Sequence, residues 1–442
     1  MEESNPGTAL IVTFRAGCIF GHPGAIWIGF SIFFYTKWME AVTPPSVIDL
    51  EKQYLLQNYA RLPVVLQRGK GCYVYDTSGK RYLDLLAGIG VNSLGYAHPR
   101  LTKVIREQAG RMIHCSNLYY HEYAGPLAER IARASGLARV FYCNSGTEAN
   151  ETALKMAKGY GHAISSGKYE IVALDNSFHG RTIGALSVTG QESYRRDFEP
   201  LMPGVRFVPR NDITALEQVV NERTCAIIME LVQGEGGIHA MTEEYVRKAR
   251  ELADRHNALL IFDEIQCGVG RTGTYFAYQL FDPAILPDII TVAKPIASGL
   301  ALGLVACNER AAGVLTPGKH GTTFGGGPLV CRAGLEFFNI LDELLPRITE
   351  VGSYFRMRLT EMQRQFSFIK EIRGVGLMIG VELEFSCKPV VLDCLENGML
   401  INCTHDYTLR ALPPYIVTEQ EVDRAITILK RVFKKTKPPQ AA

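Results

Sequence analysis

The sequence has no Cys-x-x-Cys pair, although it contains 11 cysteines in 442 residues. Zinc sites and disulfide frameworks usually show cysteines paired at short spacings, and an odd total leaves at least one cysteine without a partner. We therefore expect neither a metal site nor a disulfide framework. Free cysteines are typical of a reducing compartment, so the sequence favours a cytoplasmic protein.

An excess of charge of either sign is also missing. Lys and Arg total 47 and Asp and Glu total 45, which gives a formal net charge of +2. Proteins that bind nucleic acid usually carry a strong basic excess, so no nucleic-acid partner is expected. With 47% hydrophobic and 21% charged residues, the composition is that of a globular protein. At roughly 100–200 residues per domain, the length favours two or three domains.

Formal charges are absent from Ala16 to Thr36. A run of this length approaches the ~20 residues that cross a bilayer, so a signal anchor is one interpretation. However, Gly21-His22-Pro23-Gly24 interrupts the run, and the residues before it include two glutamates where a signal peptide would be basic. We favour the other interpretation, in which residues 1–38 are an extension outside the fold and Met39 is the working start. No membrane association is expected.

The body of the chain alternates between strand-like and helix-like segments. Short apolar runs predict buried strands at residues 139–143, 170–174, 225–229, 258–262 and 288–293. Helical periodicity between them predicts helices at 148–160 and 242–257. This alternation indicates an α/β domain with a mostly parallel sheet, whose functional groups gather at the carboxyl ends of the strands. Those ends carry Ser145, Glu230, Asp263 and Lys294.

The pattern changes near residue 331. It predicts helices at 335–345, 351–366 and 418–433, a strand-like segment at 372–380, and a short strand pair around 399–401 and 409–411. This order indicates a smaller α+β domain. We expect residues 101–330 to form the large domain. Residues 331–442 should form the small domain, which the N-terminal segment 39–100 joins.

Two glycine-rich stretches suggest nucleotide binding. Gly268–Gly273 matches GxGxxG, the fingerprint of NAD-dependent dehydrogenases, but residues 263–267 separate it from the strand and no clear helix follows. A NAD-dependent dehydrogenase therefore stays a remote alternative. Gly313–Lys319 matches GxxxxGK, yet His320 replaces the Ser or Thr that binds magnesium, and we interpret this match as chance.

Asn144–Glu148 lies between a predicted strand and a predicted helix. Small residues there allow backbone amides at a helix N-terminus to face an anion. Ser145 and Glu148 also fit a capping box, which has a purely structural role. A phosphate site becomes the better interpretation when Asp263 and Lys294 are taken into account.

Asp263 and Lys294 each directly follow a buried apolar strand, where an unpaired charge is costly. A lysine in such a place is more often a snorkelling surface residue. In a dry cleft, however, a lysine with a lowered pKa can form a Schiff base, and a carboxylate can keep a pyridinium nitrogen protonated. Together with a phosphate site, the pair predicts pyridoxal 5'-phosphate chemistry.

With these residues in place, the chain from about Tyr54 onward resembles the class III pyridoxal-phosphate aminotransferases, and within them the acetylornithine aminotransferases. The matching stretches occur in the family's order, at residues 144–151, 178–182, 233–237, 260–266, 270–273, 293–294 and 320–326. The resemblance implies a large PLP-dependent transferase domain of the aspartate aminotransferase type and a homodimer. It also explains the GxGxxG match as an active-site loop.

The resemblance implies roles for single residues. Lys294 would carry the cofactor and move the substrate proton, and Asp263 would pair with the pyridinium nitrogen. Gln266 would reach the ring hydroxyl, and Phe178 would stack on the ring. His179, next to it, is interpreted as structural.

The phosphate group would be bound by Gly146 and Thr147, joined by Thr323 from the second subunit of the dimer. This arrangement is also what the resemblance implies, and it places the site at the homodimer interface.

Two arginines would divide the substrates. The resemblance implies that Arg181 takes the α-carboxylate of the acetylated amino acid, with Thr322 nearby, and that Arg410 clamps 2-oxoglutarate. Glu235 would neutralise Arg410 when the other substrate is bound, because an unpaired buried guanidinium is costly. The expected ping-pong reaction moves the δ-amino group of N2-acetyl-L-ornithine to 2-oxoglutarate, giving N-acetyl-L-glutamate 5-semialdehyde and L-glutamate in arginine biosynthesis.

Other class III amino donors stay open: ornithine, succinylornithine, 4-aminobutyrate and a carrier-bound lysine precursor. Ile89 stands where ornithine aminotransferases carry Tyr, which argues against free ornithine, and Arg181 favours a donor with an α-carboxylate. Departures from the family occur at Leu231, Pro295–Gly299 and Gly327, where Pro, a glycine run and Asn are usual. They affect loop geometry but remove no catalytic group.

Overall fold

The computed structural model describes residues 46–436. The chain divides into two units, residues 1–63 and 64–442. The described part of the first unit contains helix α1 (Val47–Tyr54), which Ser46 caps by accepting a hydrogen bond from the amide of Asp49. The predicted extension at residues 1–38 lies outside the described residues. None of the helices in the described range is both long enough and apolar enough to cross a membrane.

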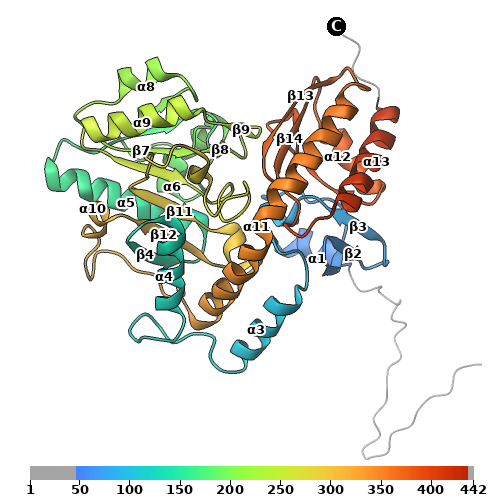
Figure 1. Ribbon diagram of the computed structural model, residues 1–442, viewed down its shortest axis with the longest axis horizontal. Helices are drawn as coiled ribbons and strands as arrows, with labels where there is room; N and C mark the ends of the chain where they lie inside the picture. Colours follow the sequence, from blue (N-terminus) through green and yellow to red (C-terminus); the bar gives the residue numbers. More distant parts are fainter. Residues whose placement is uncertain (1–45, 437–442) are drawn as a thin grey trace, which may run out of the picture. The chain divides into compact units, whose positions relative to one another are not determined.

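The second unit is built around a seven-stranded sheet with the order β4-β12-β11-β10-β7-β5-β6 (Figure 1). Its strands are β4 (Arg139–Cys143), β5 (Glu170–Leu174), β6 (Val205–Val208), β7 (Thr224–Glu230), β10 (Leu259–Asp263), β11 (Ile289–Val292) and β12 (Gly303–Cys307). Only β12 runs antiparallel to its neighbours within this sheet. The predicted α/β class with a mostly parallel sheet is therefore confirmed.

Alternate side chains of this sheet enter two different cores. In β10, Leu259 and Ile261 pack with helix α5 (Gly146–Ile164), whereas Leu260 and Phe262 join the core that includes helix α9 (Glu243–Arg255). Both faces of the sheet are thus covered by apolar side chains of helices. This is why the strands read as continuous apolar runs in the sequence.

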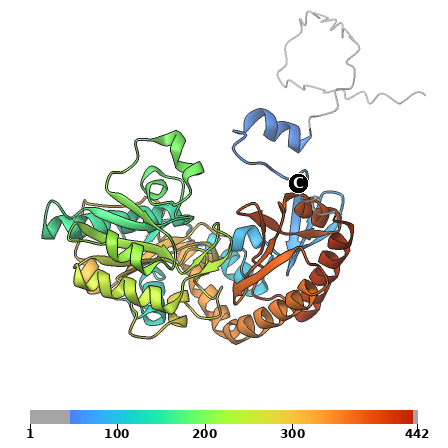
Figure 2. The same cartoon turned by 90° about the horizontal axis from the view of Figure 1, so that it is seen from above.

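Helix α11 (Pro328–Gln363) differs from the prediction. It is one helix of 36 residues where the sequence predicts two, and Pro346 lies inside it. Proline removes one backbone hydrogen bond and usually breaks a helix, which explains the predicted gap. Buried residues on both sides of it, among them Leu341 and Ile348, keep the helix packed. In Figures 1 and 2, α11 runs from the half of the unit with the central sheet to the C-terminal half.

The C-terminal half contains an antiparallel sheet with the order β13-β14-β17-β16. Its strands are β13 (Ile369–Val375), β14 (Met378–Leu383), β16 (Asn402–Thr404) and β17 (Thr408–Ala411), with helices α12 (Lys388–Glu396) and α13 (Glu419–Lys435). The predicted pairing of 399–401 with 409–411 is wrong. Strand β16 pairs with β17 instead, and the separate short strand β15 (Met399–Leu400) pairs in parallel with β3 (Arg81–Asp84).

Strand β3 also belongs to an antiparallel meander with β1 (Leu66–Lys70) and β2 (Tyr73–Asp76). The four-stranded sheet β1-β2-β3-β15 therefore combines strands from both ends of the chain. That residues 39–100 join the small domain stays a prediction. The domain boundaries at residues 100 and 330 remain a prediction.

Two cysteines, Cys387 and Cys403, form a disulfide. The expectation that the cysteines are unpaired is wrong for these two. They lie 16 residues apart, so no short spacing in the sequence indicates the pair. Helix α12 and the turn into β16 bring their Cα atoms to 5.6 Å. The other cysteines of the described residues are free.

Candidate active site

A cavity of about 430 Å³ lies at the carboxyl ends of the central strands. All four residues predicted from the strand ends line it: Ser145, Glu230, Asp263 and Lys294. The lining also includes the predicted site residues Gly146, Thr147, Phe178, Arg181 and Gln266. Ligands of α/β proteins bind at this edge of the sheet, so the cavity is the candidate active site.

One wall of the cavity is the N-terminus of helix α5, which begins at Gly146 directly after β4. Ser145 is the N-cap and accepts a hydrogen bond from the amide of Glu148. The amides of the first helical turn have no partner within the helix, and the helix dipole favours an anion there. A Cβ added to Gly146 would lie 2.8 Å from the side chain of Ile265, so only glycine fits without displacing that residue.

Asp263 ends β10, and its side chain is 3% exposed. Its Oδ2 accepts hydrogen bonds from Asn150 at 2.8 Å and from His179 Nδ1 at 2.7 Å, and its Oδ1 accepts one from the amide of Ile265 at 3.0 Å. These three donors fix the carboxylate in one orientation at the cavity wall.

Sequence reasoning missed the contacts of Asn150 and His179 with Asp263. His179 belongs to a recognisable motif, but nothing in the motif shows its partner. The helical position of Asn150, one turn inside α5, predicts only that it faces the sheet. Both are tertiary contacts across the sheet edge.

Lys294 lies one residue after the end of β11, at the start of a short 3₁₀ turn, η3 (Lys294–Ala297). Its φ of 37° lies in the left-handed region, which is uncommon for residues other than glycine and clusters at functional sites. Burial lowers the pKa of the amine, and the Asp263 carboxylate partly opposes this shift. A lowered pKa increases the share of neutral amine, which is the nucleophilic form of lysine.

Glu230, the last residue of β7, connects two loops of the cavity. Its Oε1 accepts a hydrogen bond from the amide of Phe178 at 2.8 Å, and its Oε2 accepts one from the amide of Gly234 at 2.9 Å. Burial raises the pKa of Glu230 to about 7. The side chain therefore holds the aromatic Phe178 and the loop that carries Glu235 in fixed positions.

Arg181 lies at the cavity mouth and is exposed. Its guanidinium carbon is 3.8 Å from the ring centroid of Tyr194 and 5.4 Å from that of Phe178. Aromatic faces orient a guanidinium without neutralising it, so Arg181 presents its charge to an incoming anion.

Arg410 lies in β17 with a side chain that is 1% exposed. Its Nη1 donates to Glu235 Oε1 at 2.5 Å and to Gln266 Oε1 at 3.1 Å. Burial acts to raise the pKa of Glu235, but the charge and hydrogen bond of Arg410, together with Lys294 and Gln266, outweigh it and the pKa is lowered. The two form a partly buried ion pair, which reaches the cavity through Gln266.

Four predicted site residues do not line the cavity, namely Glu235, Thr322, Thr323 and Arg410. Of these, Thr322 contacts a residue that does line it, Asn144. Thr322 Oγ1 accepts a hydrogen bond from Asn144 Nδ2 at 3.1 Å and lines a separate hollow. Thr323 is exposed beside the exposed ring of Phe324.

The GxGxxG match, Gly268–Gly273, forms a structural loop. The fully buried Arg271 donates from Nη1 to the carbonyls of Leu377 and Pro413 at 3.1 and 2.6 Å, and it packs on the ring of Tyr415. The loop therefore ties the central half of the unit to the C-terminal half and opens no helix toward a nucleotide.

Comparison with known proteins identifies the class. The model of the family "Aminotransferase class-III" matches residues 54–433. The chain therefore belongs to the class III aminotransferases. It is 48% identical to the acetylornithine aminotransferase of Methanocaldococcus jannaschii over 88% of this chain and 98% of that protein. The corresponding values for the acetylornithine aminotransferase of Aquifex aeolicus are 45%, 86% and 100%.

Solved structures of two aminotransferases agree with this class. The ornithine aminotransferase of Toxoplasma gondii matches with a TM-score of 0.83 at 34% identity, over 88% of this chain and 94% of that chain. The N-acetylornithine aminotransferase of Stenotrophomonas maltophilia matches with a TM-score of 0.76 at 31% identity, over 88% and 98%. The predicted PLP-dependent transferase fold is thus confirmed, and the NAD-dependent dehydrogenase alternative is excluded.

Class III aminotransferases use pyridoxal 5'-phosphate, and the residues present fit this group. Gly146 and Thr147 begin helix α5 and line the cavity, so the amides of its first turn are available to a phosphate. The oriented carboxylate of Asp263 suits a protonated ring nitrogen, and the Lys294 amine suits an aldehyde.

Proposed function

We propose that this aminotransferase moves the δ-amino group of N2-acetyl-L-ornithine to 2-oxoglutarate, giving N-acetyl-L-glutamate 5-semialdehyde and L-glutamate, in cytoplasmic arginine biosynthesis. One observation carries the proposal: two arginines in different surroundings, each able to bind a substrate carboxylate, lie on elements around Lys294. Arg181 is exposed and unneutralised, whereas Arg410 is buried and paired with Glu235. The names of the relatives support this amino donor.

Pyridoxal phosphate, when bound, supplies an aldehyde that accepts the amino group and a ring that withdraws electrons from the substrate carbon. In our proposal the amides of Gly146 and Thr147 bind the phosphate. Asp263, which lines the cavity and whose carboxylate three donors hold in place, would keep the ring nitrogen protonated. Gln266 would contact the ring hydroxyl, and Phe178 would cover one face of the ring.

Lys294 would bind the cofactor covalently in the resting enzyme. When the amino donor displaces it, its amine would carry a proton from the substrate carbon. The lowered pKa suits both roles, because the amine must be neutral to attack and to accept a proton.

A pH profile tests this role of Lys294. Uptake of pyridoxal phosphate by the apoprotein, followed by absorbance, should accelerate with rising pH as the amine loses its proton. The sign follows from the direction of the shift: a lowered pKa places the midpoint below pH 10.5, the value of an ordinary lysine. A rate that rises only above pH 10.5 would contradict it. The same titration of Lys294→Ala should show no covalent uptake.

Arg410 and Glu235 would act as an exchangeable pair. During the first half-reaction Glu235 neutralises Arg410, since an unpaired buried guanidinium is destabilising. When 2-oxoglutarate enters, its α-carboxylate replaces Glu235 as the partner of Arg410. One site can then accept two substrates that differ in charge.

The choice among amino donors rests on Arg181 and Ile89. Arg181 favours a donor with an α-carboxylate, and Ile89 offers no polar group to a free α-amino group. Losing a hydrogen bond to a charged group costs about 1.5–3 kcal/mol, or roughly 10- to 100-fold in rate.

Steady-state rates with a panel of donors test the substrate. We expect kcat/KM for N2-acetyl-L-ornithine to exceed the values for ornithine and 4-aminobutyrate by at least about tenfold. Equal or higher values for either of these would reject the proposed donor while leaving the aminotransferase class intact. Succinylornithine, which shares the acylated α-amino group, is the internal control for acyl-chain selectivity.

A second copy of the chain would complete the site. Exposed apolar side chains surround Thr323, with Leu118 84% and Phe324 68% exposed. Asn117 Nδ2 donates to the carbonyls of Thr322 and Gly325 at 3.1 Å, so the segments 112–120 and 322–325 lie side by side. We call these two segments the Thr323 surface. Contiguous apolar surfaces of this kind mark protein interfaces, and we propose that the Thr323 surface joins two subunits.

Charge introduced into the Thr323 surface should prevent dimerisation. Leu118→Arg and Phe324→Arg are expected to sediment as monomers and to lose cofactor on gel filtration, since Thr323 of a second subunit would no longer support the phosphate. Leu392→Arg is the matched control, because Leu392 is 49% exposed on helix α12. A monomeric parent enzyme, or dimeric Arg variants with full cofactor, would refute the interface.

A further inference from the structure

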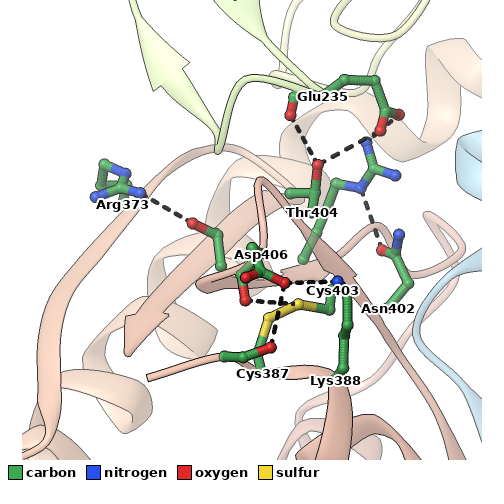
Figure 3. Close-up of a disulfide and its surroundings, with 11 residues drawn as sticks. Glu235, Arg373, Cys387, Lys388, Asn402, Cys403, Thr404 and Asp406 are labelled. Atoms are coloured by element: carbon green, nitrogen blue, oxygen red, sulfur yellow. Dashed lines mark hydrogen bonds and ion pairs between the residues drawn. A yellow bond between two sulfur atoms is a disulfide. The ribbon is translucent and has the colours of Figure 1, made fainter. Parts of the chain in front are cut away.

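The disulfide between Cys387 and Cys403 lies next to the proposed binding site for 2-oxoglutarate. Cys403 is the middle residue of strand β16, and Cys387 is the N-cap of helix α12 (Figure 3). Strand β16 has three residues and stands at the edge of its sheet, where β17 is its one strand neighbour. Strand β16 therefore has ladder hydrogen bonds on one side only, and the disulfide adds a covalent link to the start of helix α12.

The residues on either side of Cys403 both contact the Arg410–Glu235 pair. Asn402 lies directly opposite Arg410 in the strand ladder, and its Oδ1 accepts a hydrogen bond from Arg410 Nε at 3.2 Å. Thr404 Oγ1 donates to the backbone carbonyl of Glu235 at 2.8 Å. Strand β16 therefore contacts Arg410 through Asn402 and Glu235 through Thr404.

Alternation along the strand separates these contacts from the disulfide. Successive side chains of a strand point to opposite faces, so Asn402 and Thr404 face the ion pair while Cys403 faces away from it. Figure 3 shows this arrangement, with Thr404 directed at Glu235 and Cys403 directed at Cys387. The disulfide thus holds β16 from one face, while the opposite face of the same strand positions Arg410.

The two cysteines of the pair differ in burial. Cys387 is fully buried, whereas Cys403 is partly exposed. The exposed side chains of Lys388 and Asp406 pair at 2.8 Å beside the disulfide. Cys403, the less buried of the two cysteines, is therefore the sulfur that the thiolate of a reductant would attack.

We propose that the Cys387–Cys403 disulfide positions Arg410 for the 2-oxo acid, and that its reduction by a dithiol selectively weakens binding of that substrate. The inference rests on the proposed role of Arg410 in holding 2-oxoglutarate. Arg181 and Lys294 lie on other elements, in the loop after β5 and in η3, so the amino-donor half-reaction should not depend on the disulfide.

Reduction by a dithiol proceeds through two thiol–disulfide exchanges. A thiolate of the dithiol attacks Sγ of Cys403, the S–S bond breaks, and the Cys387 sulfur leaves as a thiolate that takes up a proton. The second thiol of the reductant then displaces Cys403, which also gains a proton, and closes the disulfide of the reductant. The protein gains two electrons and two protons, and the dithiol loses the same number.

The experiment compares oxidised holoenzyme with holoenzyme reduced by dithiothreitol, and alkylation followed by mass spectrometry verifies the state of both cysteines. Calorimetry measures the dissociation constant of glutarate, a dicarboxylate that lacks amino and oxo groups and cannot react. Reduction should raise this constant about three- to tenfold, the effect of weakening one or two hydrogen bonds. Single-turnover rates with N2-acetyl-L-ornithine should change by less than about twofold, which corresponds to under about 0.5 kcal/mol in the activation free energy. The reason is that Arg181 and Lys294 do not depend on the disulfide.

Three variants make the comparison specific. Cys387→Ser/Cys403→Ser should bind glutarate as weakly as reduced enzyme and should not respond to dithiothreitol. Cys307→Ser, which removes a free cysteine in β12, should respond as the parent does. Asn402→Ala should reproduce the weaker binding in the oxidised state. If the double variant fails to fold, reduction of the parent enzyme still gives the decisive measurement.

Arg410→Ala separates this inference from the proposed function. If that variant weakens glutarate binding but reduction does not, the disulfide has no positioning role and the inference fails alone. If Arg410→Ala leaves glutarate binding unchanged, the proposed role of Arg410 fails first. Isolation of the protein with both cysteines reduced in the absence of any reductant would also overturn the inference.

Discussion

Replacing Lys294 by Ala is expected to lower turnover by at least about 10²- to 10⁴-fold, the usual contribution of a general acid–base group, and by more because the covalent link to the cofactor is lost as well. No other lysine lines the cavity among the described residues. The remaining contacts of the phosphate with helix α5 should keep pyridoxal phosphate bound. The variant would therefore be folded, loaded and inactive.

Two measurements check this outcome. Turnover of N2-acetyl-L-ornithine gives the loss of rate, and absorbance after dialysis gives the cofactor that stays bound. Lys158→Ala is a matched control, because burial also lowers the pKa of Lys158, yet its amine donates to backbone carbonyls of Tyr169 and Pro203 away from the cavity. Turnover by Lys294→Ala within tenfold of the control would refute the assignment of Lys294.

The sequence was sufficient to predict which residues gather at the cavity. Ser145, Glu230, Asp263 and Lys294 lie at the carboxyl ends of four different strands, and parallel strands of one sheet end at the same edge. Each strand is an uninterrupted apolar run because both faces of the sheet are buried, so the strand ends are easy to locate. Topology then brings the four residues together without any information on their contacts.

Contacts that depend on packing between distant segments could not be predicted. Asn150 and His179 reach Asp263 from two other elements, and Thr404 reaches Glu235 across 169 positions of the chain. The disulfide between Cys387 and Cys403 belongs to the same group, because only the packing of α12 against β16 brings the two cysteines together. Such contacts have no periodicity and no fixed spacing, and so they leave no pattern in the sequence.

The continuity of helix α11 shows a related limit. Local propensity predicts an interruption at Pro346, whose ring cannot donate a backbone hydrogen bond. The long helix persists because its buried face packs against α3 (Pro99–Ala109) and α4 (Ala124–Ser135) on one side and against β13 and α13 on the other. Tertiary burial here outweighs a local cost of about 3 kcal/mol.

Substitution of the two arginines should separate the two half-reactions. Losing a charge-assisted carboxylate contact costs on the order of 2–4 kcal/mol in transition-state binding, or about 30- to 1,000-fold in rate. Arg410→Ala should therefore slow the half-reaction with 2-oxoglutarate far more than the half-reaction with N2-acetyl-L-ornithine. In the half-reaction with the amino donor, the only effect of Arg410→Ala is that Glu235 loses its ion-pair partner. This loss should cost little, because Glu235 is partly exposed to water.

Arg181→Ala should show the reverse pattern. Arg181 is exposed and makes no ion pair with any described residue, so its removal leaves no buried charge and should not disturb the fold. Single-turnover absorbance, following the bound cofactor first with the amino donor and then with 2-oxoglutarate, measures each half-reaction separately. Arg61→Ala controls for general loss of positive charge, because Arg61 pairs with Glu51 outside the second unit. If both substitutions slowed both half-reactions equally, the arginines would support the structure and would not divide the substrates between them.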